Sequence, residues 1–287
     1  MAKKRATLTD LLNDLTFRNL FNKYKMLAMS QFEWVGLPEG LESKHIERAL
    51  FNFGKAIFFK DPNASYMCLE AQTSGKQNVY GEPLGWIATG VGYHKHVKDE
   101  DCVIISNNIL RVSTYDIVMH YVNKMTECER TMDVNVKAVK TPYIFACDDK
   151  DVMTFKRMFQ QIDGNVPALY MDRGINLDSI SVMQTGVKFL CNDIMDYKKS
   201  VENELFTFLG FNNSPIDKKE RVNVHEVESN NQLIESFGDL GFRSRQMARD
   251  EIREMFGLAD LDVIRKEVNV NALGNELRDH GSDAGTE

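Results

Sequence analysis

The sequence predicts a mainly α-helical fold with α/β parts, built around two long helices. Apolar residues recur at intervals of three and four over 115–139 and again over 187–209, as one stripe of a helix requires. Between these helices, residues 141–184 alternate between strand-like and helix-like runs. A helix of about 25 residues is roughly 35 Å long, and two such rods bury little surface by themselves. We therefore expect neighbouring copies of the chain to supply further packing surface.

The segments before the first long helix predict shorter elements. A basic start, Lys3–Lys4–Arg5, precedes a helix that Thr7 or Thr9 can cap and that extends to about Ala28. A second helix is expected at 42–53. Residues 56–112 are rich in glycine and in short β-type runs, of which DCVIISNN (101–108) is the clearest strand. The region before 113 is therefore mixed α/β.

A polar stretch separates the second long helix from the next helix, which is expected at 232–258. The long helix ends at Gly210, a residue suited to a left-handed C-terminal position. Residues 213–232 then read NSPIDKKERVNVHEVESNNQ, with acidic side chains interleaved among Lys218, Lys219 and Arg221. A loop of this length in a compact protein is functional or disordered, and a charge run by itself is typical of a solvated loop. Gly238 and Gly241 are expected to bend the helix that follows, and we expect the tail, 259–287, to be disordered in part.

Composition narrows the class of protein. The chain is 43% hydrophobic and 27% charged, with a net charge of −7. This balance argues against a surface coated with basic residues for static nucleic-acid binding, although a local basic ring or arm stays compatible with it. The five cysteines contain no Cys-x-x-Cys pair, which suits a reducing compartment and predicts no zinc framework. No apolar run approaches the ~18 residues of a membrane span, and we expect no cofactor.

Three further patterns have a structural and a functional interpretation. His94 and His96 would share one strand face, and with Cys102 they could begin a metal site, but a polar strand face is favoured. Clustered carboxylates could hold two metals in a nucleic-acid enzyme, but acids at a helix start or on a solvated edge are the simpler interpretation; they are Asp148, Asp149, Asp151, Asp193 and Asp196. Phe32, Trp34 and Leu37 are expected to pack in the core, with a docking patch as the alternative.

Several stretches, in order along most of the chain, resemble the portal (upper collar, head–tail connector) proteins of small short-tailed phages with protein-primed DNA replication. They are MAKKR, QFEWVGLP, FGKAIFFKDP, VKTPYIFACDDKD, QIDGNVPALY, LDSISVM, ENELFTFLGFNN and KKERVNVHEVESNNQLIES. The resemblance implies a portal-type fold and a ring of twelve copies around a channel at one capsid vertex. It also implies assembly in the host cytoplasm and a final place in the virion.

The resemblance assigns a part to each segment. An N-terminal arm and wing (1–113) precede a stem helix (114–140), an α/β clip (141–184) and a second stem helix (185–211). A channel loop (212–231), a wing or crown helix (232–258) and the tail (259–287) follow.

The resemblance also implies partners and site residues. Double-stranded DNA would pass through the ring, facing Lys218, Lys219 and Arg221 of the channel loop and, as further candidates, Lys198 and Lys199 of the second stem helix. The arm residues Lys3, Lys4 and Arg5 would contact a packaging RNA. Capsid and scaffolding proteins, lower collar and tail proteins, and a packaging ATPase complete the expected partners. No catalytic residue is expected; the alternatives are a metal-dependent nucleic-acid enzyme and another ring-shaped head–tail adaptor.

Overall fold

The computed structural model describes residues 8–62, 65–140, 143–146, 153, 181–184, 186–212 and 224–266. The chain divides into two compact units, and each is described by itself. The larger unit contains the residues up to Glu127 and those from Tyr197 onward, and the smaller unit contains Cys128–Asp196.

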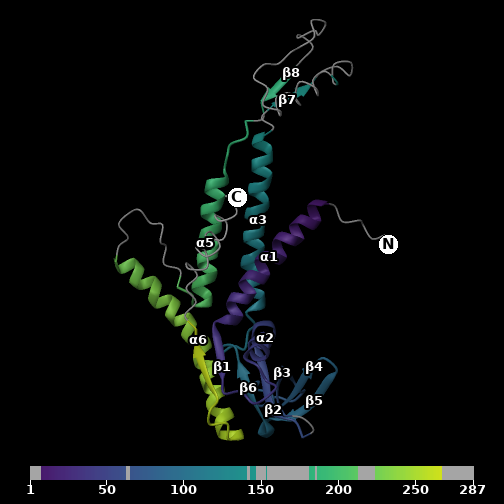
Figure 1. Cartoon of the computed structure of the whole chain (residues 1–287), viewed down its shortest axis with the longest axis vertical. Coiled ribbons are helices and arrows are strands. Elements are labelled where there is room, and N and C mark those ends of the chain that lie inside the picture. Colours follow the sequence, from purple (N-terminus) through teal and green to yellow (C-terminus); the bar gives the residue numbers. More distant parts are fainter. Residues whose placement is uncertain are drawn as a thin grey trace, which may run out of the picture. The chain divides into compact units, whose positions relative to one another are not determined.

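A five-stranded antiparallel sheet forms the centre of the larger unit (Figure 1). Four of its strands follow one another as a meander, and the fifth returns to pair with the first, so that the order is β5-β4-β3-β2-β6. The strands are β2 (Lys55–Lys60), β3 (Tyr66–Thr73), β4 (Gly85–Gly90), β5 (Tyr93–Lys98) and β6 (Cys102–Ser106). The strand expected in DCVIISNN is thus confirmed, and a 3-10 turn, Asp99–Asp101, joins β5 to β6.

Both faces of this sheet are buried. Phe58 and Ile105 point to one face and pack with Ile46 and Leu50 of α2 (Ser43–Phe53). Ile57 points to the other face and packs with Phe59, Trp86, Ala88 and Val97. Since neighbouring residues of a strand alternate between faces, β2 (KAIFFK) must be apolar at successive positions to serve both cores.

A two-stranded ladder joins distant parts of the chain. In this ladder β1 (Phe32–Val35) pairs antiparallel with β9 (Asp262–Arg265), Phe32 lying opposite Arg265. Phe32 and Trp34 are buried, as predicted for this aromatic segment. The strand β9 lies within the segment expected to be a tail, 259–287. A strand of four residues leaves little periodic signal, and its pairing partner is far away in sequence, so the sequence pattern did not reveal it.

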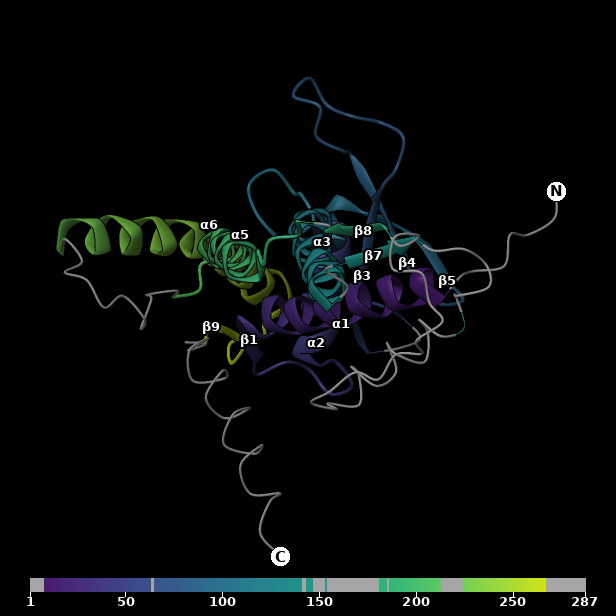
Figure 2. The same cartoon turned by 90° about the horizontal axis from the view of Figure 1, so that it is seen from above.

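Three helices share a second core of the larger unit. Tyr24 of α1 (Leu8–Ser30) packs with Val118 and Val122 of α3 (Tyr115–Lys140), and with Val201 and Leu205 of α5 (Cys191–Leu209). Figure 2, viewed along the two long helices, shows α3 and α5 side by side with α1 across them. The buried parts of the stripes predicted at 115–139 and 187–209 therefore face each other in this core, while other members, Tyr197 among them, are exposed. Thr9 lies inside α1 rather than at its cap, and Thr7 is outside the described residues.

The helix α6 (Val224–Phe256) begins eight residues before its predicted start at 232. The end of the predicted polar loop, 224–231, is therefore helical. Residues 224–229 contain no glycine or proline, and extending an existing helix costs far less than starting one. The helix also passes Gly238 and Gly241 without interruption. These glycines allow close approach instead: a Cβ on Gly238 would collide with the guanidinium of Arg265.

In the smaller unit, Asn135 of α3 holds the segment that leads into α5. The Asn135 Nδ2 donates to the Lys188 carbonyl oxygen (2.8 Å), and the Leu190 N–H donates to Asn135 Oδ1 (2.9 Å). These bonds use backbone groups next to the helix, which explains why α5 begins at Cys191 and not at 187. Two strands lie within the segment 141–184, where strand-like runs are predicted: β7 (Tyr143–Ala146) and β8 (Ser181–Gln184), paired antiparallel. Most of the predicted clip lies outside the described residues.

Candidate nucleic-acid interface on the long helices

Of the basic residues predicted to meet DNA, the structure places two. Lys198 and Lys199 lie on α5 within the larger unit. The three residues of the channel loop, Lys218, Lys219 and Arg221, lie outside the described residues. So do the three residues of the basic arm, Lys3, Lys4 and Arg5.

Lys198 belongs to the packing face of α5. It precedes the buried residues Val201 and Leu205 by three and seven positions, which places all three on one side of the helix. Lys198 is accordingly half-buried, and it lies near the carboxylate of Glu202, one turn further along. Its position fits an intramolecular contact better than an exposed channel wall.

The carboxylate of Glu202 is the centre of a polar cluster between α5 and α1. The Tyr24 hydroxyl donates to Glu202 Oε1 at 2.6 Å, and the Lys23 ammonium lies 3.0 Å from the same oxygen. Burial raises the pKa of Glu202, but the hydrogen bond from Tyr24 and the charges of Lys23 and Lys198 outweigh burial, so the net pKa lies below its ordinary value. The sequence gives no signal for this cluster, because Lys23 and Glu202 are 179 residues apart.

Lys199 differs from Lys198 because it is exposed. One position along a helix turns the side chain by about 100°, so Lys199 lies on the outer side of α5 with the exposed Met195, Asp196 and Asn203. It can approach a phosphate without breaking a contact of the fold. Of the two lysines, the structure favours Lys199 as the candidate for DNA contact.

Acidic residues on α5 limit the attraction between Lys199 and the phosphates of a duplex. Asp193, Asp196 and Glu204 are also exposed on α5. Phosphate contacts by single lysines carry no sequence information, and mixed charges keep the net attraction low. Such a surface can stay close to a duplex without holding it at a fixed position.

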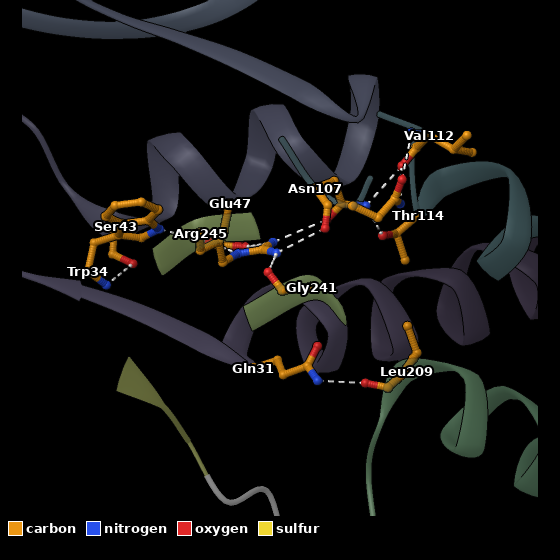
Figure 3. Close-up of polar contacts among 11 residues, drawn as sticks. Gln31, Trp34, Ser43, Glu47, Asn107, Val112, Thr114, Leu209, Gly241 and Arg245 are labelled. Atoms are coloured by element: carbon orange, nitrogen blue, oxygen red, sulfur yellow. Dashed lines mark hydrogen bonds and ion pairs between the residues drawn. The ribbon is translucent and has the colours of Figure 1, made fainter. Parts of the chain in front are cut away.

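A buried ion pair fixes two helices of the larger unit to one another (Figure 3). The guanidinium of Arg245 on α6 bonds both carboxylate oxygens of Glu47 on α2, at 2.9 and 2.7 Å, and both side chains are 3% exposed. The Trp34 indole N–H donates to the same carboxylate (2.9 Å), and Arg245 also donates to Asn107 Oδ1 (3.1 Å). The pair thus joins α6, α2, β1 and the turn after β6.

The other chemical signals do not form a site within the described residues. His94 and His96 are both exposed on β5, and His96 Nδ1 lies 3.4 Å from the Ser74 hydroxyl. No three histidine, cysteine, aspartate or glutamate side chains gather as metal ligands in the part of the chain that the structure describes. Asp148, Asp149 and Asp151 lie outside that part. Within it, no helix has the length and apolar character needed to cross a bilayer.

Two long paired helices, attached to a mixed α/β wing and interrupted by a small β-containing segment, define a portal-type fold. Residues 4–269 match the Phage Connector (GP10) family. The chain belongs to this family, and it is a head–tail connector of the portal type, a component of the phage virion.

Chains of solved structures are similar to this chain at low sequence identity. The chain has a TM-score of 0.52 and 11% identity with a chain in the neck of a native gene transfer agent particle computed with C12 symmetry, over 94% of this chain and 86% of that one. A chain of the virion of the native gene transfer agent particle gives a TM-score of 0.50 at 10% identity, over 96% and 90%. A chain from the portal and tail of native bacteriophage P68 gives 0.46 at 14% identity, over 99% and 100%.

A match among curated proteins is to an RNA polymerase subunit and not to a phage protein. The DNA-directed RNA polymerase subunit beta'' of Phaeodactylum tricornutum (strain CCAP 1055/1) is 22% identical in an alignment of length 248 that covers 77% of this chain. The chain spans only 17% of the length of that polymerase subunit. This identity does not show membership in the polymerase family, and the connector family covers more of the chain.

Proposed function

We propose that twelve copies of this chain form a ring at one capsid vertex, through which double-stranded DNA enters during packaging and leaves during ejection. The observation that carries the proposal is the family match over 4–269, which includes both long helices and the wing. The twelvefold symmetry is that of a gene transfer agent neck with the same fold. In this ring α3 and α5 form the stem around the channel.

Exposed apolar side chains support assembly into a ring. Val134 on α3 is 63% exposed, Phe189 before α5 is 58% exposed, and Tyr197 on α5 is 56% exposed. Such exposed apolar side chains on the long helices are suited to burial against a neighbouring copy. Neighbouring stem helices of the ring would cover these residues.

The charge distribution supports a channel in which DNA slides. Each residue that faces the channel becomes a ring of twelve, so a few lysines suffice to keep a duplex centred. A strongly basic wall would bind many phosphates at once, and the duplex would be held in place. Because the net charge is −7 and the charges on α5 are mixed, the channel wall would not hold the duplex in place. In this proposal Lys199 and the loop residues Lys218, Lys219 and Arg221 supply the contacts.

The ring supplies symmetry and docking surfaces rather than catalysis. A partner ATPase would drive the DNA, tail proteins would bind at the clip, and capsid and scaffolding proteins would bind the wing. The basic arm Lys3–Lys4–Arg5 would contact a packaging RNA. These partners follow from the portal role, and the chain itself is proposed to have no enzymatic activity.

The native mass of the purified protein tests the ring. One copy weighs 32.9 kDa, so twelve times 32.9 kDa gives about 395 kDa. Native mass spectrometry should show a species of this size, and negative-stain images of the same fraction should show particles with a central hole. A stable monomer at micromolar concentration would contradict the proposal.

A further inference from the structure

The outer side of α6 in the larger unit borders an open cleft. The cleft has a volume of about 870 Å³ and lies between the C-terminal half of α6, the strand β6 and the connection from β3 to β4. Exposed apolar side chains stand along it: Met247 is 66% exposed, Leu84 is 58% exposed and Met255 is 43% exposed. Methionine side chains adapt their shape to a partner, and this combination is typical of a protein-docking surface.

Three carboxylates give the cleft its charge. Asp99, Glu251 and Glu254 line it, together with Glu82, whose charge is balanced by Arg111 at 2.7 Å. Burial raises the pKa of Glu251, and the neighbouring charges of Asp99 and Glu254 raise it further. The cleft therefore carries excess negative charge, which a cationic partner would relieve.

The same chain carries a basic stripe on a surface that shares no residue with the cleft. Lys44 and Arg48 are four residues apart on the exposed side of α2, opposite the side that packs on the sheet. Lys44 also forms an exposed ion pair with Glu42 at 2.7 Å, which a partner surface would have to displace. Lys25 of α1 lies next to α2, because its ammonium is 5.4 Å from the ring centre of Phe51, a buried residue three positions beyond Arg48. Met26, next to Lys25, is 67% exposed.

We propose that the acidic cleft on α6 docks the basic stripe on α2 and α1 of a second copy of this chain. The inference rests on the proposed ring, because a ring forms when two different surfaces of one chain complement each other. The charges are of opposite sign, and exposed methionines accompany them: Met247 and Met255 in the cleft, and Met26 beside Lys25. The contact pairs Arg48 and Lys44 of one copy with Glu251 and Glu254 of the next, and opposite charges on the two surfaces fix which neighbour fits.

Charge reversal on each surface tests the pairing. One variant carries Glu251→Arg and Glu254→Arg, and the other carries Lys44→Glu and Arg48→Glu. Each variant alone sets like charges against each other, so the fraction of protein in rings, measured by native mass spectrometry, should fall by about tenfold or more. An equimolar mixture should form rings again, because the reversed cleft of one variant then fits the reversed stripe of the other.

The mixture is also the control for folding, because a misfolded chain cannot restore assembly. If either variant alone forms rings as the wild type does, the inference is wrong. It is also wrong if the mixture stays dissociated while both variants keep the wild-type far-ultraviolet circular dichroism. A variant that loses this signal is replaced by Arg48→Cys with Glu251→Cys, treated with a short bismaleimide linker. A ladder of cross-linked oligomers that is missing when only one of the two new cysteines is present supports the pairing. Absence of the ladder from the double variant overturns it.

These outcomes separate the inference from the proposed function. A monomeric wild type would contradict the ring itself. Rings in the wild type and in both reversed variants would leave the ring intact and would show that other surfaces join the copies.

Discussion

At the scale of single residues, the buried ion pair of Glu47 and Arg245 is expected to affect stability strongly. Both side chains are almost fully buried, so removal of one leaves a charge without its partner in a poorly solvated place. We predict that Glu47→Ala lowers the free energy of unfolding by about 3–5 kcal/mol. Denaturant unfolding at fixed protein concentration, followed by tryptophan fluorescence, measures this loss, since Trp34 bonds the same carboxylate.

The matched control removes an exposed carboxylate from an ion pair. Asp14 pairs with Arg18 on α1, and their side chains are 50% and 69% exposed. Asp14→Ala should cost less than about 1 kcal/mol, because water replaces the lost contact. Equal losses in the two variants would show that burial does not decide the strength of these pairs.

Glu202 gives a prediction that depends on pH. Its folded-state pKa lies below the ordinary value of 4.5, so its charged form stabilises the fold above that value, and this contribution is lost as the pH falls through the folded-state pKa. Glu202→Gln should therefore cost about 1–2 kcal/mol at pH 7. The difference between wild type and variant should shrink as the pH falls below about 4.5. Denaturant unfolding at a series of pH values measures it, and a constant difference would contradict the assignment.

At the scale of elements, the crossing of α5 and α6 depends on two glycines. Gly210 ends α5 with φ of 74° and lies against the backbone of Gly238 on α6. The guanidinium of Arg265 covers this crossing and donates to the Gly210 carbonyl oxygen at 2.8 Å. A side chain on Gly238 would collide with that guanidinium, so Arg265 would have to move away and give up its bond to Gly210.

We therefore predict that Gly238→Ala destabilises the protein although alanine favours a helix by about 1 kcal/mol over glycine. The control is Gly241→Ala on the same helix, where the nearest neighbour of a new Cβ is the end of the Arg245 side chain at 3.3 Å. Gly241→Ala should destabilise the protein less than Gly238→Ala does, because its new Cβ is tightly packed but collides with no atom. Thermal unfolding of both variants tests the pair, and a higher melting temperature for Gly238→Ala would contradict the close crossing.

Local patterns predicted these helices better than they predicted their contacts. The stripes of α3 and α5 repeat over many turns, so their existence and type could be predicted from the sequence. The start of α5 could not be predicted from the sequence. It depends on hydrogen bonds from Asn135, which lies more than fifty residues earlier in the chain. The same holds for β9, which pairs with β1, and for the cluster of Lys23, Tyr24 and Glu202. Each depends on a partner far away in the sequence, and no short-range pattern contains that information.

At the scale of the whole molecule, symmetry changes what a weakly basic segment can do. A loop with two lysines has little affinity for DNA in one copy. Twelve copies around one channel would place twenty-four lysine charges about the same duplex. Attraction to phosphate then adds up without base contacts, and it weakens as salt rises. The same argument explains why Lys199 can contribute although acidic residues surround it.

This reasoning leads to a prediction for the channel loop. Replacement of both Lys218 and Lys219 by alanine should leave ring assembly and the start of packaging largely intact, because a loop in the channel does not join the copies. Retention of packaged DNA should fall, since phosphate contacts that hold the duplex are lost. The measurement compares filled particles of wild type and variant after packaging stops, at two salt concentrations, with Lys76→Ala as a control on an exposed residue of the β3–β4 connection. Loss of rings in the double variant would place the loop in a subunit interface instead. Unchanged retention at both salt concentrations would show that other residues hold the DNA.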